Sequence, residues 1–187
     1  MIDHLVVSVK GPHRLNASSH ILFSQNGSGM IEAINEEIFT EKATRHNYTT
    51  GVVSHRVTLN APFDITRTGF AAISLGPVPQ TKSDIEATKS SYLLNALPFV
   101  PRFNATPYSF LDVFQIQLEK LTVNAFCNLL CALKDARNKD LFTIPETGHM
   151  LLKEIFQVVN TLPELRDIPG ILERFSVERL EVTVNGI

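Results

Sequence analysis

The feature that most constrains the fold is a change of hydrophobic pattern near residue 105. Before it, short apolar or β-branched runs end in polar or glycine residues, as buried strands of an α/β sheet do. These runs span residues 4–10, 20–27, 48–59, 63–69 and 71–78. After it, glycine becomes rare, and apolar residues recur at helical spacing over 109–135, 146–161 and 176–185. We therefore predict an α/β domain at residues 1–105, followed by an all-α domain at 106–187.

Two details of the first part bear on its topology. Residues 27–39 carry apolar side chains at helical spacing, which predicts a helix between the second and third runs. Only the nine-residue stretch GPHRLNASS separates the first two runs. A crossover between parallel strands needs a dozen residues or more, so these two strands are either antiparallel or have lost a crossover helix.

Composition and charge exclude several classes of function. The net charge is −2 and no basic run is present, so neither nucleic acid nor an anionic membrane surface is an expected partner. The apolar stretches are too short for a membrane-spanning helix. The six histidines are scattered, and we predict no metal site. Two cysteines, Cys127 and Cys131, lie one helical turn apart, and we interpret them as small buried side chains rather than as a redox pair. The small number of cysteines favours a reducing compartment, the cytoplasm, and leaves mitochondria open.

A polar stripe marks the helix predicted at 109–135. Lys120, Asn124 and Asn128 follow one another at four-residue spacing, and Gln117 and Asp135 join them within about 80° of the helix circumference. Asparagine is a poor helix former, so its repetition requires a reason. An ordinary solvent face would be wider and richer in charge. The stripe is suited to the wall of a cleft, although a plain solvated stripe remains the alternative.

The residues of this helix resemble a known signature. EKLTVNAFCNLLCALKDARNKDL is similar to the Lys/Asn/Asn/Asn pattern of ketopantoate reductases (2-dehydropantoate 2-reductases), with Lys120, Asn124, Asn128 and Asn138 in place. Upstream, HLVVSVK, ILFSQNGSGMIEAINE and GVVSHRVTLNAPFDITRTGFAAISLGP resemble the second half of that family's NADP-binding domain, in the same order. Near the end, LPELRDIPGILERFSVERLE is similar to fungal members.

The resemblance implies an activity and a set of roles. The family reduces 2-dehydropantoate to pantoate with NADPH, on the route to pantothenate and coenzyme A. Lys120 would be the general acid that protonates the ketone oxygen, since a lysine can donate a proton to a developing alkoxide. Asn124, Asn128 and Asn138 would bind the substrate, because an amide both donates and accepts hydrogen bonds. The residues beside the cofactor would be Lys10, Asn26 and Val57.

The sequence also departs from the family pattern. It contains no G-x-G-x-x-G turn of the kind that binds a cofactor pyrophosphate, and Leu129, Lys139 and Arg56 stand where the family has a proline, a glycine and a small residue. The resemblance therefore implies a central piece of such a reductase, lacking the N-terminal phosphate-binding βαβ unit and the C-terminal end. Residues 1–105 would be the second half of a Rossmann-like NADP-binding domain, and residues 106–187 the first helices of the C-terminal domain. We expect it to bind NADPH weakly or not at all, and to associate or aggregate through uncovered sheet edges.

Two other functions remain open. The chain could be a non-catalytic relative whose helical half is a protein-interaction module, which the missing phosphate loop favours. It could also belong to a reductase of another 2-keto acid with the same two-domain architecture. A substrate panel distinguishes the second alternative from the main prediction.

Overall fold

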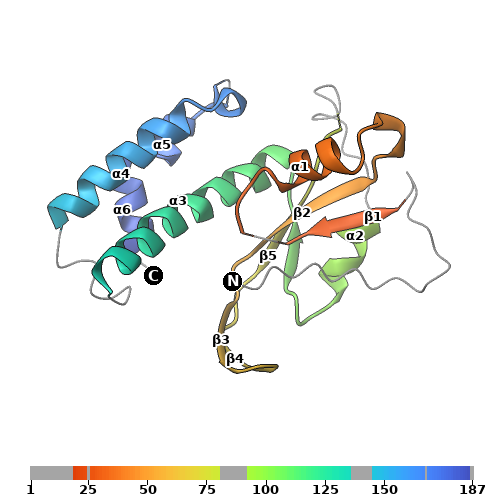
Figure 1. Ribbon diagram of the computed structural model, residues 1–187, viewed down its shortest axis with the longest axis horizontal. Coiled ribbons are helices and arrows are strands. Elements are labelled where there is room, and N and C mark those ends of the chain that lie inside the picture. The colour runs from red at the N-terminus through yellow and green to blue at the C-terminus, as the bar shows by residue number, and fades with distance from the viewer. Residues whose placement is uncertain (1–18, 25, 81–91, 136–144, 167, 186–187) are drawn as a thin grey trace. The chain divides into compact units, whose positions relative to one another are not determined.

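The computed structural model describes residues 19–24, 26–80, 92–135, 145–166 and 168–185 (Figure 1). The strand predicted at 4–10, with Lys10, lies outside these residues, and so does Asn138. The chain divides into two compact units, Met1–Gln117 and Leu118–Ile187. The division falls inside helix α3 (Phe110–Lys134), later in the chain than the change of pattern near residue 105.

The described residues of the first unit form a mixed four-stranded sheet in the order β1-β2-β5-β6. The strands are β1 (His20–Phe23), β2 (Asn47–Val53), β5 (Ile73–Pro77) and β6 (Ala105–Pro107). Strands β1 and β2 are parallel, β2 and β5 are antiparallel, and β5 and β6 are parallel. The predicted strands at 20–27 and 71–78 are therefore confirmed within a partly parallel α/β sheet.

The parallel β1–β2 pair needs a long connection, and helix α1 (Met30–Glu37) provides it, followed by the 3-10 turn η1 (Lys42–Thr44). The predicted helix at 27–39 is confirmed, but it begins at Met30, because Gly27 and Gly29 have positive φ and form a turn before it. Tyr48 on β2 donates a hydrogen bond of 2.8 Å from its hydroxyl to the side-chain oxygen of Asn35, which ties α1 to the sheet.

The core of the first unit lies along the two central strands. Residues Tyr48–Val52 of β2 are all buried, as expected for a strand covered on both faces. Leu75 of β5 is fully buried and packs with Leu94 and Ala105. Leu94 belongs to helix α2 (Tyr92–Ala96), which continues into the turn η3 (Leu97–Phe99).

Strand β6 is not among the predicted strands, because it lies at the change of hydrophobic pattern near residue 105. Three residues are too few to show a strand period in the sequence. The strand forms because its backbone pairs with β5, in the register Ile73↔Ala105 to Leu75↔Pro107. Tyr108 then donates its backbone N–H to the Leu75 carbonyl at 2.7 Å, just before α3 begins.

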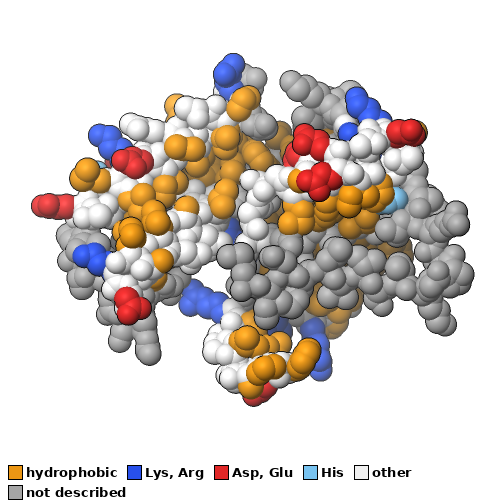
Figure 2. Space-filling model, viewed as in Figure 1, with side chains coloured by type: hydrophobic (Ala, Val, Ile, Leu, Met, Phe, Trp, Pro, Cys, Tyr) orange, Lys and Arg blue, Asp and Glu red, His pale blue; other side chains and the backbone are white. Residues whose placement is uncertain are grey.

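The predicted strand at 48–59 is two strands. β2 ends at Val53, and β3 (Arg56–Ala61) pairs with β4 (Asp64–Gly69) in a separate two-stranded sheet. Every residue of β3 is exposed, and apolar side chains gather on this hairpin in Figure 2. The base of the hairpin is fixed by His55, whose ring accepts the Ala71 N–H at 3.0 Å and lies 3.0 Å from the Phe103 carbonyl oxygen.

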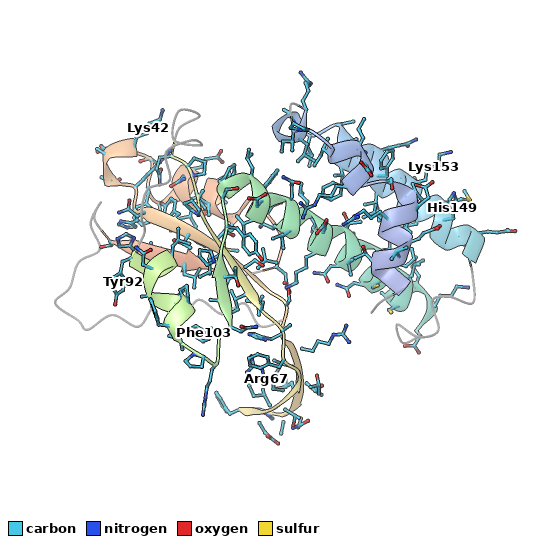
Figure 3. All side chains as sticks on the ribbon, turned by 180° about the vertical axis from the view of Figure 1, so that it is seen from behind. Lys42, Arg67, Tyr92, Phe103, His149 and Lys153 are labelled. Carbon is cyan, nitrogen blue, oxygen red and sulfur yellow. The ribbon has the colours of Figure 1, made fainter. Side chains whose placement is uncertain are left out.

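Arg67 adds to this base. Its guanidinium donates to the Arg102 carbonyl at 3.0 Å and lies over the Phe70 ring, 4.3 Å from the ring centroid. Figure 3 labels Arg67 and Phe103, which come from β4 and from the segment before β6. Segments far apart in the sequence thus hold the hairpin at its base.

The second unit is helical, as predicted. Its elements are the later part of α3, α4 (Pro145–Asn160), η5 (Pro163–Leu165), α5 (Ile171–Arg174) and α6 (Val177–Asn185). Its core includes Phe126, Leu152, Phe175 and Leu180, each at most 4% exposed. Helix α4 packs on α6, and His149, labelled in Figure 3, lies 2.7 Å from the Glu181 carboxylate. Among the helices that the structure describes, none combines the length and hydropathy needed to cross a bilayer.

Candidate functional site

The candidate site is carried by α3, and the sequence at its start explains why the helix begins there. Ser109 precedes the first helical residue, and its hydroxyl accepts the backbone N–H of Asp112 at 3.1 Å. The same hydroxyl donates to the Asp112 carboxylate at 2.6 Å. This reciprocal arrangement satisfies an N–H that the helix itself leaves unpaired.

One face of α3 holds the predicted site residues. Lys120, Asn124 and Asn128 all lie within the helix, so their four-residue spacing places them in one line. Gln117, one turn earlier, belongs to the same face. Asp135 does not, because α3 ends at Lys134 and Asp135 takes a left-handed conformation with φ 48°. The predicted stripe is thus correct through Asn128 and wrong at Asp135.

The three side chains differ in exposure. Lys120 and Asn124 are partly buried, whereas Asn128 is exposed. Burial lowers the pKa of the Lys120 ammonium from its usual value, because the charged form loses solvation. A lysine with a lowered pKa gives up its proton more readily near neutral pH, which is the property that a general acid needs.

A second element of the candidate site is the turn after β1. Asn26 is exposed there, between the strand and helix α1. Gly27 and Gly29 adopt φ values of 100° and 88°, a backbone region that glycine occupies without strain. The side-chain amide of Gln117 donates to the Gly27 carbonyl, so the turn is tied to the polar face of α3 within the first unit.

Val57 lies apart from this turn. It belongs to the β3–β4 sheet rather than to the sheet of β1, and its side chain is 54% exposed. The structure therefore places Asn26 at the end of a sheet strand and Val57 on a projecting hairpin.

The cofactor that the resemblance implies fits the described residues only in part. Asn26 offers an exposed amide at the carboxyl end of β1, where open α/β sheets bind their ligands. The described helix that follows, α1, has Glu32 in its first turn, and its negative charge opposes a phosphate group there. The described residues thus provide a polar contact for a cofactor but no phosphate site. They also hold no cluster of three or more His, Cys, Asp or Glu side chains that could bind a metal ion.

Several contacts around the site were not predicted. The predicted stripe includes Gln117, but nothing in the sequence links this residue to Gly27. The ion pair between Arg174 and Glu119, with Nε and Oε1 2.7 Å apart, joins α5 to the turn of α3 that carries Lys120. The contact of Gly76 in β5 with Val113 of α3 was also not predicted, although a signal existed for it, since a glycine inside a strand often marks the close approach of another element.

Known proteins resemble this chain in both of its parts. The family described as "Ketopantoate reductase PanE/ApbA" matches residues 2–80, and its C-terminal counterpart matches residues 112–185. The chain is 27% identical over 161 residues to the 2-dehydropantoate 2-reductase of Saccharomyces cerevisiae, covering 75% of this chain and 42% of that protein. It is also 27% identical over 140 residues to the ketoisovalerate reductase BEA2 of Gibberella intermedia, covering 69% of this chain and 35% of the relative.

Among solved structures, the chain is similar to the probable 2-dehydropantoate 2-reductase panE of Bacillus subtilis. The TM-score is 0.58 at 22% identity, covering 90% of this chain and 52% of the other. This similarity supports the fold: a Rossmann-like sheet followed by a helical domain. The chain spans less than half the length of the curated relatives it matches. The two family matches together cover most of the sequence, and the chain therefore belongs to the ketopantoate reductase family.

Proposed function

We propose that this chain contributes the proton donor and the substrate-binding amides of an NADPH-dependent reduction of 2-dehydropantoate to pantoate. The observation that carries the proposal is the partly buried Lys120, aligned with Asn124 and Asn128 on one helix inside the segment that matches the family's C-terminal domain. The names of the Saccharomyces and Bacillus proteins support the substrate class. The proposed domains remain residues 1–105 for the cofactor and 106–187 for the substrate.

In this reaction NADPH, when bound, supplies a hydride to the carbonyl carbon of the substrate. The carbonyl oxygen then gathers negative charge, and Lys120 transfers a proton from Nζ to that oxygen, which completes the alcohol. Burial of Lys120 favours this transfer because it lowers the pKa of the ammonium group.

The asparagines orient the substrate. Asn124 and Asn128 can each donate to a carboxylate or keto oxygen and accept from a hydroxyl, so two amides in line suit an oxygen-rich acid. Asn138 has the same role in the proposal. On the cofactor side, Asn26 offers its amide, Val57 an apolar contact and Lys10 a positive charge. The thiols of Cys127 and Cys131 favour a reducing, intracellular setting for the reaction.

The kinetic test uses a hybrid protein, because the chain spans 42% of the Saccharomyces relative. The parts of that relative on either side of the match are joined to this chain, and NADPH oxidation is followed with 2-dehydropantoate. Lys120→Ala should lower kcat by about 10²- to 10⁴-fold. Asn124→Ala should raise KM at least as much as it lowers kcat, because it removes contacts to bound substrate. The matched control is Lys134→Ala, an exposed lysine on the same helix. Unchanged turnover in Lys120→Ala would refute the proton-donor role.

A second candidate is the reduction of 2-ketoisovalerate, which the similarity to the Gibberella enzyme favours. This acid lacks the terminal hydroxymethyl group of 2-dehydropantoate. A site that hydrogen-bonds that hydroxyl should discriminate strongly against the smaller acid, since its buried polar groups would be left without a partner. The ratio of kcat/KM for the two acids in the hybrid protein decides between them.

A further inference from the structure

The side chain of Gln117 connects two parts of the first unit that are far apart in the sequence. It comes from α3, is partly buried, and donates its amide N–H to the backbone carbonyl of Gly27, 90 residues away. Gly27 directly follows Asn26, the residue proposed to contact the cofactor. The bond therefore acts on the turn that carries Asn26, whose side-chain amide is proposed to contact the cofactor.

The turn itself has little to hold it in shape. Its two glycines both have positive φ, and a Cβ added at either would meet no described atom within 4 Å, so packing does not restrain them. Helix α1 uses the carbonyl of Gly29, which accepts the Ala33 N–H at 3.0 Å, and leaves the carbonyl of Gly27 to Gln117. Because glycine has the greatest backbone freedom, such a turn needs an external partner to adopt one conformation.

The position of Gln117 is itself fixed. Val113, one helical turn earlier on the same face of α3, is fully buried and packs against Gly76 of β5. This contact sets the rotation of α3 relative to the sheet, and residues at i and i+4 share a face. Gln117 is thus presented to the turn by the packing of the helix, not by the chance position of a long side chain.

We propose that Gln117 is a positioning residue, which holds the Asn26–Gly27 turn in the conformation that lets Asn26 bind the nicotinamide cofactor. The proposal rests on the proposed function for its cofactor, but its structural part is independent of catalysis. Gln117 acts through the Gly27 carbonyl and contacts none of the reacting atoms.

The experiment uses the full chain in three variants, followed by NMR. Gln117→Leu removes the donor, Gln117→Glu replaces it with an acceptor, and Gln117→Lys restores an N–H donor of similar length. The backbone amide signals of Gly27 and Ser28, which flank the Gly27 carbonyl, should shift in the first two variants because that carbonyl loses its donor, and Gln117→Lys should return them toward their wild-type positions. Amides of β2 should not change. The matched control is Gln115→Leu, because the Gln115 amide bonds to Leu111 within its own helix.

NADPH at millimolar concentration supplies the second readout. The side-chain amide signal of Asn26 should shift in the wild-type chain and in Gln117→Lys, and should shift less in Gln117→Leu. Unchanged Gly27 and Ser28 signals in Gln117→Leu would refute the positioning role itself. Shifted turn signals with an unaltered response of Asn26 to NADPH would refute its link to cofactor binding. A wild-type chain whose Asn26 signal does not respond to NADPH would instead refute the proposed contact of Asn26, whatever the turn signals show.

Discussion

Gly76 lies so close to Val113 that a Cβ added to the glycine would come within 2.2 Å of Val113 Cγ1 and 2.8 Å of its Cβ. Real atoms do not approach this closely, so the absence of a side chain at Gly76 is what lets α3 pack on β5. Since Gln117 shares a face of α3 with Val113, this contact also orients the Gln117 side chain within the first unit.

Replacing Gly76 with alanine should therefore destabilise the protein. The added methyl group must push α3 away from the sheet, and overpacking of this kind costs about 1–3 kcal/mol. Urea unfolding measures the loss. In a double-mutant cycle, adding Val113→Ala should recover part of it, because the smaller side chain makes room. Additive losses in the cycle would mean that the two residues do not conflict.

The sequence predicted the parts of the fold that have a strong period. Helices α3, α4 and α6 were recovered nearly to their ends, and so was the stripe from Lys120 to Asn128, because both depend on local spacing. Strand β6 and the bond from Gln117 to Gly27 were missed, since each depends on a partner distant in the sequence. The break between β2 and β3 was missed for a similar reason: the chain stays extended while its hydrogen-bonding partner changes.

The tip of the β3–β4 hairpin offers a stabilising substitution. Ala61 pairs with Asp64, which leaves Pro62 and Phe63 as the two central residues of the turn. Proline fixes φ near about −65°, and Phe63 has φ 66°, a combination that favours glycine or asparagine at the second position. Phe63 is also fully exposed. Phe63→Asn should raise the free energy of unfolding by about 1 kcal/mol by relieving the left-handed strain.

The same substitution bears on self-association. The hairpin exposes more than half of each of four apolar side chains: Val57, Leu59, Phe63 and Ile65. Among the described residues, the outer edges of its two strands pair with no further strand. We expect the chain to associate at high concentration, and light scattering should show less association for Phe63→Asn. Leu59→Asn is the control, because it removes an exposed apolar group without changing the turn. It should reduce association but give no gain in stability.

The ion pair between Glu119 and Arg174 should contribute measurably to the second unit. The two side chains are 28% and 30% exposed. Phe175 and Ile171, which lie close to Arg174 in the sequence, are buried and fix the backbone there, so little conformational entropy is lost when the pair forms. A cycle of Glu119→Gln and Arg174→Gln should give a coupling of about 0.5–1 kcal/mol, reduced by salt. The His149–Glu181 pair, at 56% and 41% exposure, should couple less strongly in the same assay. Equal couplings would show that burial does not decide the strength of these pairs.

Binding of NADPH to this chain should be weak. The sequence has no G-x-G-x-x-G turn, and the first turn of α1 carries Glu32 where a phosphate would need positive potential. Isothermal titration calorimetry measures the affinity directly, and low-micromolar binding would contradict this expectation. Glu32→Gln should strengthen binding slightly if a phosphate does approach α1, whereas Glu36→Gln, at the far end of the helix, should not.

The lowered pKa of Lys120 also makes stability depend on pH in a defined direction. Burial disfavours the charged form in the folded state, so between the folded and unfolded pKa values the unfolded chain binds more protons. The free energy of unfolding should therefore rise with pH between these two pKa values. Below the folded pKa, the lysine is charged in both states, and the full cost of burying the charge lowers the stability of the protein. Lys120→Met removes this cost, and its advantage over the wild type should be largest near neutral pH and shrink as the pH rises toward the usual lysine value. Urea unfolding at a series of pH values tests this, with Lys134→Met as the exposed control on the same helix. A difference between Lys120→Met and wild type that stays constant with pH would mean that folding leaves the proton affinity of Lys120 unaltered, and the basis for its role as a tuned acid would be lost.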